Sequence, residues 1–138
     1  MTQQKNVCFA GHRNKWQIKC DEEKLQEVVE NLINNGYTDF YDGNMGYFDY
    51  LCKKTVVKLK EKYPHIKLIK VLTYYQHEKD KFTLPEYYDD TVFPFTEEYH
   101  FKQRIIKRNE WIVDTCEVLV CHIRETYKSG AYRTVKYA

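Results

Sequence analysis

The chain has 138 residues, which is enough for one domain with a buried core. Its 22 Lys and Arg residues against 20 Asp and Glu give a net charge of +2. This balance argues against a general nucleic-acid-binding protein, because such proteins carry a clear basic excess. No apolar run approaches the length of a membrane span, about 18 residues, and the first residues lack the apolar segment of a signal peptide. We therefore expect a single cytoplasmic domain over residues 1–138, without a membrane partner.

Five cysteines are present, an odd number, and no two of them form a CxxC pair. This pattern predicts reduced thiols that serve as small apolar residues rather than a disulfide framework. Cys116 and Cys121 have no second close pair to complete a tetrahedral zinc site. We therefore expect no metal.

The first half of the chain alternates between strands and helices. Residues 5–10 are expected to form a buried strand that ends at Gly11, residues 21–35 a helix, and residues 38–42 a second strand. Asp21 is a suitable N-cap for the helix. One apolar stripe at helical spacing predicts the buried side of this helix: Leu25, Val28, Val29, Leu32 and Ile33.

The second half continues the alternation. A helix is predicted over 47–62, a third strand over 66–73, a helix over 97–115 and a fourth strand over 117–123, before a last helix that begins near the end of the chain. The residues expected to face inward from these helices are Phe48, Leu51, Cys52, Val56, Leu59, Phe101, Ile105, Trp111 and Ile112. Residues 74–95 read as an irregular, Tyr-rich loop or lid.

Strands that alternate with helices imply a parallel sheet covered on both faces. The sequence therefore predicts an α/β fold: a three-layer sandwich with a mostly parallel sheet of four or five strands and helices on both faces. In a strand order 3-2-1-4, the first and fourth strands are neighbours. Ligands of such sheets bind beyond the carboxyl ends of the strands, where the strand order reverses.

Three loops at strand ends carry residues suited to an anionic, sugar-containing ligand. A glycine lets the backbone approach a ligand closely, and the helix that follows offers free N–H groups to a phosphate. Arg13 is suited to a bidentate phosphate contact, and Asp49 to ribose hydroxyls or to a role as base. The three segments are Gly11-His12-Arg13, Gly43-Asn44-Met45-Gly46 with Asp49 shortly after, and Ser129-Gly130-Ala131.

Structural explanations stand beside these functional ones. Asp49 also suits the N-terminus of its own helix. The spacing of three cations on the third helix favours a solvated face: Arg104, Lys107 and Arg108. Arg108 and Asn109 are, however, also placed to reach the crevice at the strand ends.

Several motifs, in order along the chain, resemble the YpsA-like branch of the SLOG superfamily, a Rossmann-like group that includes the DNA-processing DprA proteins and the cytokinin-activating LOG proteins. The motifs are VCFAGHR at 7–13, FYDGNMGYFD at 40–49, RNEWIVD at 108–114 and SGA at 129–131. The resemblance implies a Rossmann-like fold and a crevice for nucleotide-derived ligands such as NAD, ADP-ribose or a nucleoside monophosphate, with no obligatory cofactor. The loops and the resemblance together predict these ligand-binding residues: Gly11, His12, Arg13, Gly43, Asn44, Gly46, Asp49, Arg108, Asn109, Ser129, Gly130 and Ala131.

The chain departs from the LOG proteins at their catalytic PGGxGTxxE motif. Ser129 replaces the first glycine, Ala131 replaces the threonine, and no glutamate follows. We therefore favour a binding protein that senses or sequesters its ligand. The alternative is an N-glycosidase, of the LOG-like phosphoribohydrolase or deoxyribosyltransferase type, that uses Asp49 or Glu98. A third reading is a scaffold whose crevice is filled by the Tyr-rich segment.

The related proteins add a further strand after the last helix, whereas this chain stops at Ala138. On this reading the fourth strand is a sheet edge, which is an association hazard unless it is covered. A homodimer through this edge is therefore a hypothesis.

Overall fold

The computed structural model describes residues 5–11, 20–43, 46–72, 88–92, 101–122 and 130–138. Within them, five parallel strands form one sheet in the order β4-β3-β2-β1-β5. The strands are β1 (Asn6–Gly11), β2 (Asp39–Asp42), β3 (Lys67–Val71), β4 (Asp90–Val92) and β5 (Val118–His122). The helices are α1 (Glu22–Asn34), α2 (Tyr47–Lys60), α4 (Phe101–Thr115) and α5 (Gly130–Tyr137). The predicted α/β fold with a parallel sheet is confirmed.

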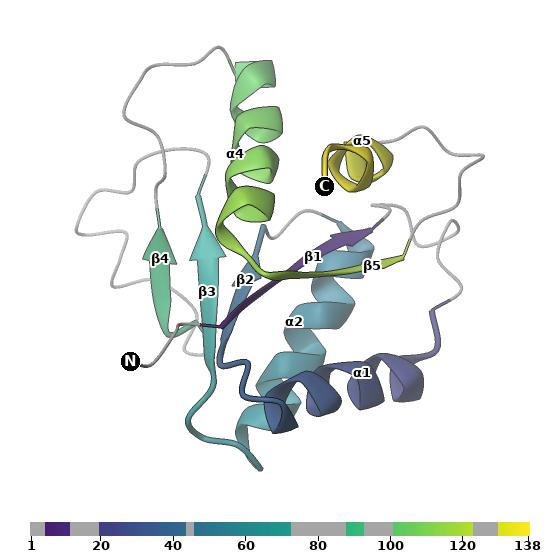
Figure 1. The fold of residues 1–138 in the computed structure, drawn as a ribbon, viewed down its shortest axis with the longest axis vertical. Helices are drawn as coiled ribbons and strands as arrows, with labels where there is room; N and C mark the ends of the chain where they lie inside the picture. Colours follow the sequence, from purple (N-terminus) through teal and green to yellow (C-terminus); the bar gives the residue numbers. More distant parts are fainter. Residues whose placement is uncertain (1–4, 12–19, 44–45, 73–87, 93–100, 123–129) are drawn as a thin grey trace.

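The helices form two layers, with α1 and α2 on one side of the sheet and α4 and α5 on the other (Figure 1). Alternate strand residues point to opposite faces. Val7 and Phe9 of β1 therefore pack with α1 and α2, whereas Cys8 packs with Ile112 of α4. None of the helices that the structure describes has the length and apolarity needed to cross a membrane.

Helix α1 begins as its sequence predicts, because Asp21 Oδ1 accepts hydrogen bonds from Glu23 N at 3.0 Å and Lys24 N at 3.4 Å. Its stripe is buried at three positions: Leu25, Val29 and Ile33. The prediction is wrong for Val28, which is 41% exposed. Val28 lies at the border of the stripe, on a side of α1 that faces a groove instead of the sheet.

The inward side of α2 is confirmed, since its five predicted residues are all buried. On α4, Ile112 is buried, Ile105 is half-buried, and Trp111 packs edge-on against Tyr41 with 6.0 Å between ring centres. The side chain of Phe101 lies outside the described residues.

Strand β4 was not predicted, because it falls within the segment 74–95 that reads as an irregular loop. The strand is short, and Asp89 attaches it to β3. Asp89 Oδ2 accepts the N–H of Leu68 at 2.8 Å, and Asp89 N donates to Leu68 O at 2.9 Å. Three residues are too few to show a strand periodicity, and the contacts that place them come from β3. The remainder of the Tyr-rich segment, predicted as a loop or lid, lies outside the described residues except for Tyr88 and Asp89.

Candidate functional site

The chain reverses its direction of travel across the sheet beside β1. The connections from β1 to β4 lead to one side, and the connection through α4 returns to place β5 on the other side of β1. At this point Gly11, the last residue of β1, lies opposite His122, the last residue of β5. Parallel sheets bind their ligands beyond the carboxyl ends of the strands at such a switch point. The Gly11–His122 pair therefore marks the candidate site.

A groove of about 500 Å³ lies beside this pair, between the start of α1 and the end of β5. Its lining combines apolar and polar side chains, as ligand sites generally do. The ring of His122 lies 6.0 Å from the ring of Phe48, and its Nδ1 is buried without a hydrogen-bond partner among the described residues. The lining residues are Cys20, Asp21, Lys24, Leu25, Val28, Phe48, Val120, Cys121 and His122.

Gly11 has a structural reason to be glycine. A Cβ atom at this position would lie 2.2 Å from Cγ and 2.5 Å from Cβ of Phe48, which is buried at the start of α2. Real Cβ atoms do not approach other atoms so closely, so β1 and α2 can pack here only because residue 11 has no side chain. The predicted ligand contact of Gly11 stays a prediction.

The N-terminus of α1 differs from the expectation for a phosphate site. The sequence predicts that the helix after β1 offers free N–H groups to an anion. In the structure the carboxylate of Asp21 already accepts two of them, and Glu22 and Glu23 add negative charge to the first turn. A phosphate is therefore disfavoured at this helix end, because an anion of the protein occupies the place it would take.

A second group of charged side chains gathers where β2 ends. Asp42 is 0% exposed, Asp49 in the first turn of α2 is 7% exposed, and Arg108 of α4 is 4% exposed. Arg108 Nη1 donates to Gly43 O at 2.9 Å. A Cβ atom on Gly43 would lie 3.2 Å from Arg108 Nη2 and 3.5 Å from Asp49 Oδ2, so both side chains converge on this glycine. Arg108 thus links α4 to the segment that leads from β2 to α2.

The prediction of a solvated face is therefore wrong for Arg108. Its guanidinium also donates to Asn109 Oδ1 from Nε at 3.3 Å and from Nη2 at 3.1 Å. Lys107 does lie in solvent and forms an ion pair with Glu110 at 3.6 Å. Buried charges require partners of opposite charge or hydrogen bonds, and Arg108 and the buried carboxylate of Asp49 both lie against Gly43.

Asp42 and Tyr88 lie in this buried group but were not predicted as site residues. Tyr88 donates its hydroxyl to Asp42 Oδ2 at 2.7 Å, and Lys70 Nζ lies 5.6 Å from the centre of the Tyr88 ring. Asp42 could have been found from the sequence, because it is a polar residue at the carboxyl end of a predicted strand. His122 holds the same position at the end of β5. No spacing rule points to Tyr88, which is 46 residues from Asp42.

The other predicted site residues divide into two sets. Gly46 is the N-cap of α2 with φ 91° and ψ −169°, a conformation that glycine alone adopts readily. Gly130 begins α5, and Ala131 follows in its first turn. A second set lies outside the described residues: His12, Arg13, Asn44, Glu98 and Ser129.

The five cysteines are free. Burial raises the pKa of the Cys52 thiol well above its ordinary value, and the nearby charges of Asp49 and Asp42 raise it further. A thiol with a raised pKa is a poor nucleophile near neutral pH. Among the described residues, no three His, Cys, Asp or Glu side chains are placed to hold a metal ion.

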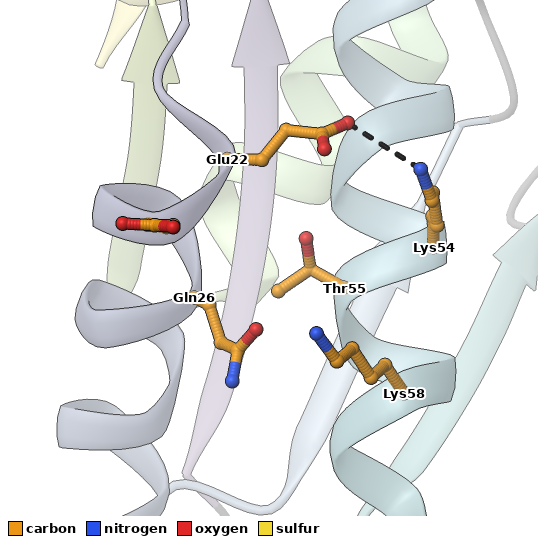
Figure 2. Close-up of a pocket in the computed structure, with 6 residues that line it drawn as sticks. Glu22, Gln26, Lys54, Thr55 and Lys58 are labelled. Atoms are coloured by element: carbon orange, nitrogen blue, oxygen red, sulfur yellow. Dashed lines mark ion pairs between the residues drawn. The ribbon is translucent and has the colours of Figure 1, made fainter.

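A smaller groove of about 300 Å³ runs between α1 and α2. Figure 2 shows Glu22 and Gln26 of α1 across it from Lys54, Thr55 and Lys58 of α2. Glu22 and Lys54 form an ion pair at 3.5 Å, but more than half of each side chain is exposed, so the pair contributes little. The hydroxyl of Thr55 donates to Leu51 O at 2.8 Å, so its proton is already used within α2. This groove offers no chemistry comparable to that at the strand ends.

Comparisons with known proteins bear on the fold. A scan of protein-family models and a search of curated proteins gave no match. Among solved structures, the X-ray structure of TM1055, a structural genomics target, aligns with 98% of this chain and 68% of that chain, with a TM-score of 0.59 and 14% sequence identity. The fold is Rossmann-like. In a Rossmann-like sheet the switch point lies at the first strand, where Gly11 and His122 meet in this chain.

Proposed function

We propose that the chain binds a nucleotide-derived ligand, such as NAD, ADP-ribose or a nucleoside monophosphate, and senses or sequesters it. The observation that carries the proposal is the groove of about 500 Å³ beside the Gly11–His122 pair, at the switch point of a Rossmann-like sheet. The ordered motifs that resemble the YpsA-like branch of the SLOG superfamily support the same ligand class. Phosphate contacts are assigned to Arg13 and to the first turn of α5, because Asp21 already occupies the end of α1.

The alternative is an N-glycosidase that uses Asp49. Its support is the burial of Asp49 next to Arg108 and Gly43, an arrangement that fixes a carboxylate near the strand ends. Catalysis requires that the carboxylate reach the anomeric centre or the attacking water. Asp49 does not line the groove, and its Oδ2 is directed to Gly43. This placement favours binding over cleavage.

A thermal-shift screen with NAD, ADP-ribose, AMP and ribose 5-phosphate tests the proposal, followed by mass analysis of the recovered ligand. A ligand at a hundredfold excess over its dissociation constant stabilises the native state by about 2.7 kcal/mol. We expect at least one of these compounds to raise the melting temperature and to be recovered intact. Cleavage of the bound compound would establish the glycosidase instead, and no shift with any of them would refute both.

Two tryptophan variants locate the site, and a third tests the phosphate contact. Val28→Trp introduces a large ring at the exposed border of the groove and should abolish the shift. Glu27→Trp, at the neighbouring exposed position of α1, does not line the groove and should leave the shift unchanged. Arg13→Ala should weaken binding of phosphorylated compounds. Equal shifts in the two tryptophan variants would place the ligand elsewhere.

A further inference from the structure

The groove of about 500 Å³ at the switch point is lined by apolar side chains from three elements. Leu25 and Val28 come from α1, Phe48 from α2 and Val120 from β5. Leu25 and Phe48 are buried, whereas Val28 is 41% exposed and Val120 is half-buried, so part of this apolar surface is open to a ligand. Covering such surface removes it from water, which favours a part of the ligand that is itself apolar.

The α1 wall of the groove is poorly suited to a phosphate. Asp21 lines this wall, and its carboxylate accepts two N–H groups of the first turn of α1, where a phosphate would otherwise bind. Cys20 lines the same wall and reports the cost of a negative charge there: burial raises the pKa of its thiol, and the charges of Asp21 and Glu22 raise it further. Lys24 offsets Asp21, so the described lining residues carry no net positive charge for a phosphate.

His122 supplies a polar group at the β5 wall of the groove. Its ring lies 6.0 Å from the buried ring of Phe48, with 34° between the two planes, and its Nδ1 is buried without a hydrogen-bond partner among the described residues. A neutral imidazole has one donor and one acceptor nitrogen. A partner that carries both a donor and an acceptor can therefore bond to this ring whichever nitrogen holds the proton, and such a bond favours binding because the polar group is poorly satisfied without it.

We propose that the groove receives the nucleobase of the ligand and that His122 contacts the polar edge of the base. The inference rests on the proposed function, a nucleotide-derived ligand, whose three parts differ in chemistry. A phosphate would meet the carboxylate of Asp21, and a ribose would bring its hydroxyls against Val28 and Val120. A base has an apolar face for these side chains and an edge with both donors and acceptors for the imidazole.

Adenosine provides the first test, because it carries a base without a phosphate. Ligand-observed NMR should show that the wild-type chain binds adenosine and that inorganic phosphate does not displace it. Val28→Trp should abolish adenosine binding by filling the groove. Glu27→Trp, the matched change at an exposed neighbour that does not line the groove, should leave binding unchanged. Circular dichroism checks that both variants are folded.

The outcomes separate this inference from the proposed function. Three results would overturn the base assignment and leave the proposed function intact: binding of AMP without binding of adenosine, adenosine binding that persists in Val28→Trp, and displacement of adenosine by inorganic phosphate. If adenosine, AMP, ADP-ribose and NAD all fail to bind, the proposed function is refuted and this inference with it.

His122→Phe tests the contact with the edge of the base, because it keeps an aromatic ring and removes both nitrogens. The wild-type chain should bind adenosine about three- to tenfold more tightly than purine riboside, which lacks the amino group. His122→Phe should bind the two compounds equally, whereas Cys121→Ser, a change at the neighbouring exposed position of the groove, should keep the preference. Equal binding by the wild type, or a preference that remains in His122→Phe, overturns the assignment of His122.

Discussion

Tyr88 and Asp42 form a buried hydrogen bond between the start of β4 and the end of β2, with the phenol oxygen 2.7 Å from Asp42 Oδ2. Asp42 is 0% exposed and Tyr88 is 8% exposed. A carboxylate without access to water depends on the donors that the fold supplies. This hydrogen bond therefore helps to hold the segment before β4 against the end of β2.

Tyr88→Phe removes only the hydroxyl and should lower the free energy of unfolding by about 1 to 3 kcal/mol, since the buried carboxylate loses a donor. Urea denaturation measures the change. Tyr137→Phe is the matched control, because the Tyr137 hydroxyl also donates to a carboxylate, that of Asp114 at 2.9 Å, but at the surface. Its effect should stay within about 0.5 kcal/mol. Equal effects of the two substitutions would contradict the role of burial.

Arg108→Met should destabilise the chain by about 3 kcal/mol or more, because it removes a buried cation beside the buried carboxylate of Asp49. Lys107→Met, on the exposed side of the same helix, should have little effect. The double variant Arg108→Met with Asp49→Asn should lose less stability than the sum of its single changes, since the two side chains converge on Gly43. Strict additivity in urea denaturation would show that they act separately.

Gly11→Ala should cost about 1 to 3 kcal/mol, because its Cβ would overlap the buried ring of Phe48 and force β1 and α2 apart. Gly43→Ala should cost less, since the nearest atom there is Arg108 Nη2 at 3.2 Å, the end of a long side chain. Thermal melts of both variants measure the difference. A larger loss in Gly43→Ala would refute the packing explanation of Gly11.

Glu30 predicts a pH dependence of stability. Hydrogen bonds from Lys62 and Tyr63 hold the pKa of Glu30 below its ordinary value of 4.5, and Glu30 raises the pKa of Lys62. A lowered carboxyl pKa adds stability above pH 4.5 and loses it as the pH falls through the folded value. The raised pKa of Lys62 comes from the same ion pair, so while Glu30 is ionised its contribution is present below the ordinary lysine pKa and is lost as the pH rises through the folded value.

Glu30→Gln should therefore melt at a lower temperature than wild type around neutral pH, and the two melting curves should converge in acid. Glu27→Gln, an exposed change on the same helix, supplies the baseline. A difference between wild type and Glu30→Gln that persists unchanged in strong acid would rule out the ion pair as its cause.

The sequence pattern predicted the parts of the fold that depend on local periodicity. Helix α2 shows apolar residues at helical spacing, and these are the residues that the structure buries. Val28 was wrongly predicted to be buried, because the apolar side of α1 is wider than the part of it that packs against the sheet. Three-residue β4 was missed because its strand conformation comes from pairing with β3, which leaves no local signal.

The position of the switch point between the first strand and the strand after α4 was predictable from the sequence, but the side-chain contacts around it were not. Glycines and an acid after β1 and β2 indicated the carboxyl ends of the strands. Arg108, however, reads as one of several surface cations, and its burial follows from where α4 crosses the end of β2. The Tyr88–Asp42 bond joins residues far apart in the chain. Such contacts are decided by topology, which spacing along a sequence does not encode.

Arg108 connects parts of the fold that the sheet keeps apart. It belongs to α4, on one side of the sheet, and its guanidinium binds the carbonyl of Gly43, in the segment that leads to α2 on the other side. A displacement of α4 therefore pulls on the segment before α2 and on Asp49 in the first turn of that helix. The two helix layers are mechanically coupled at the carboxyl end of β2.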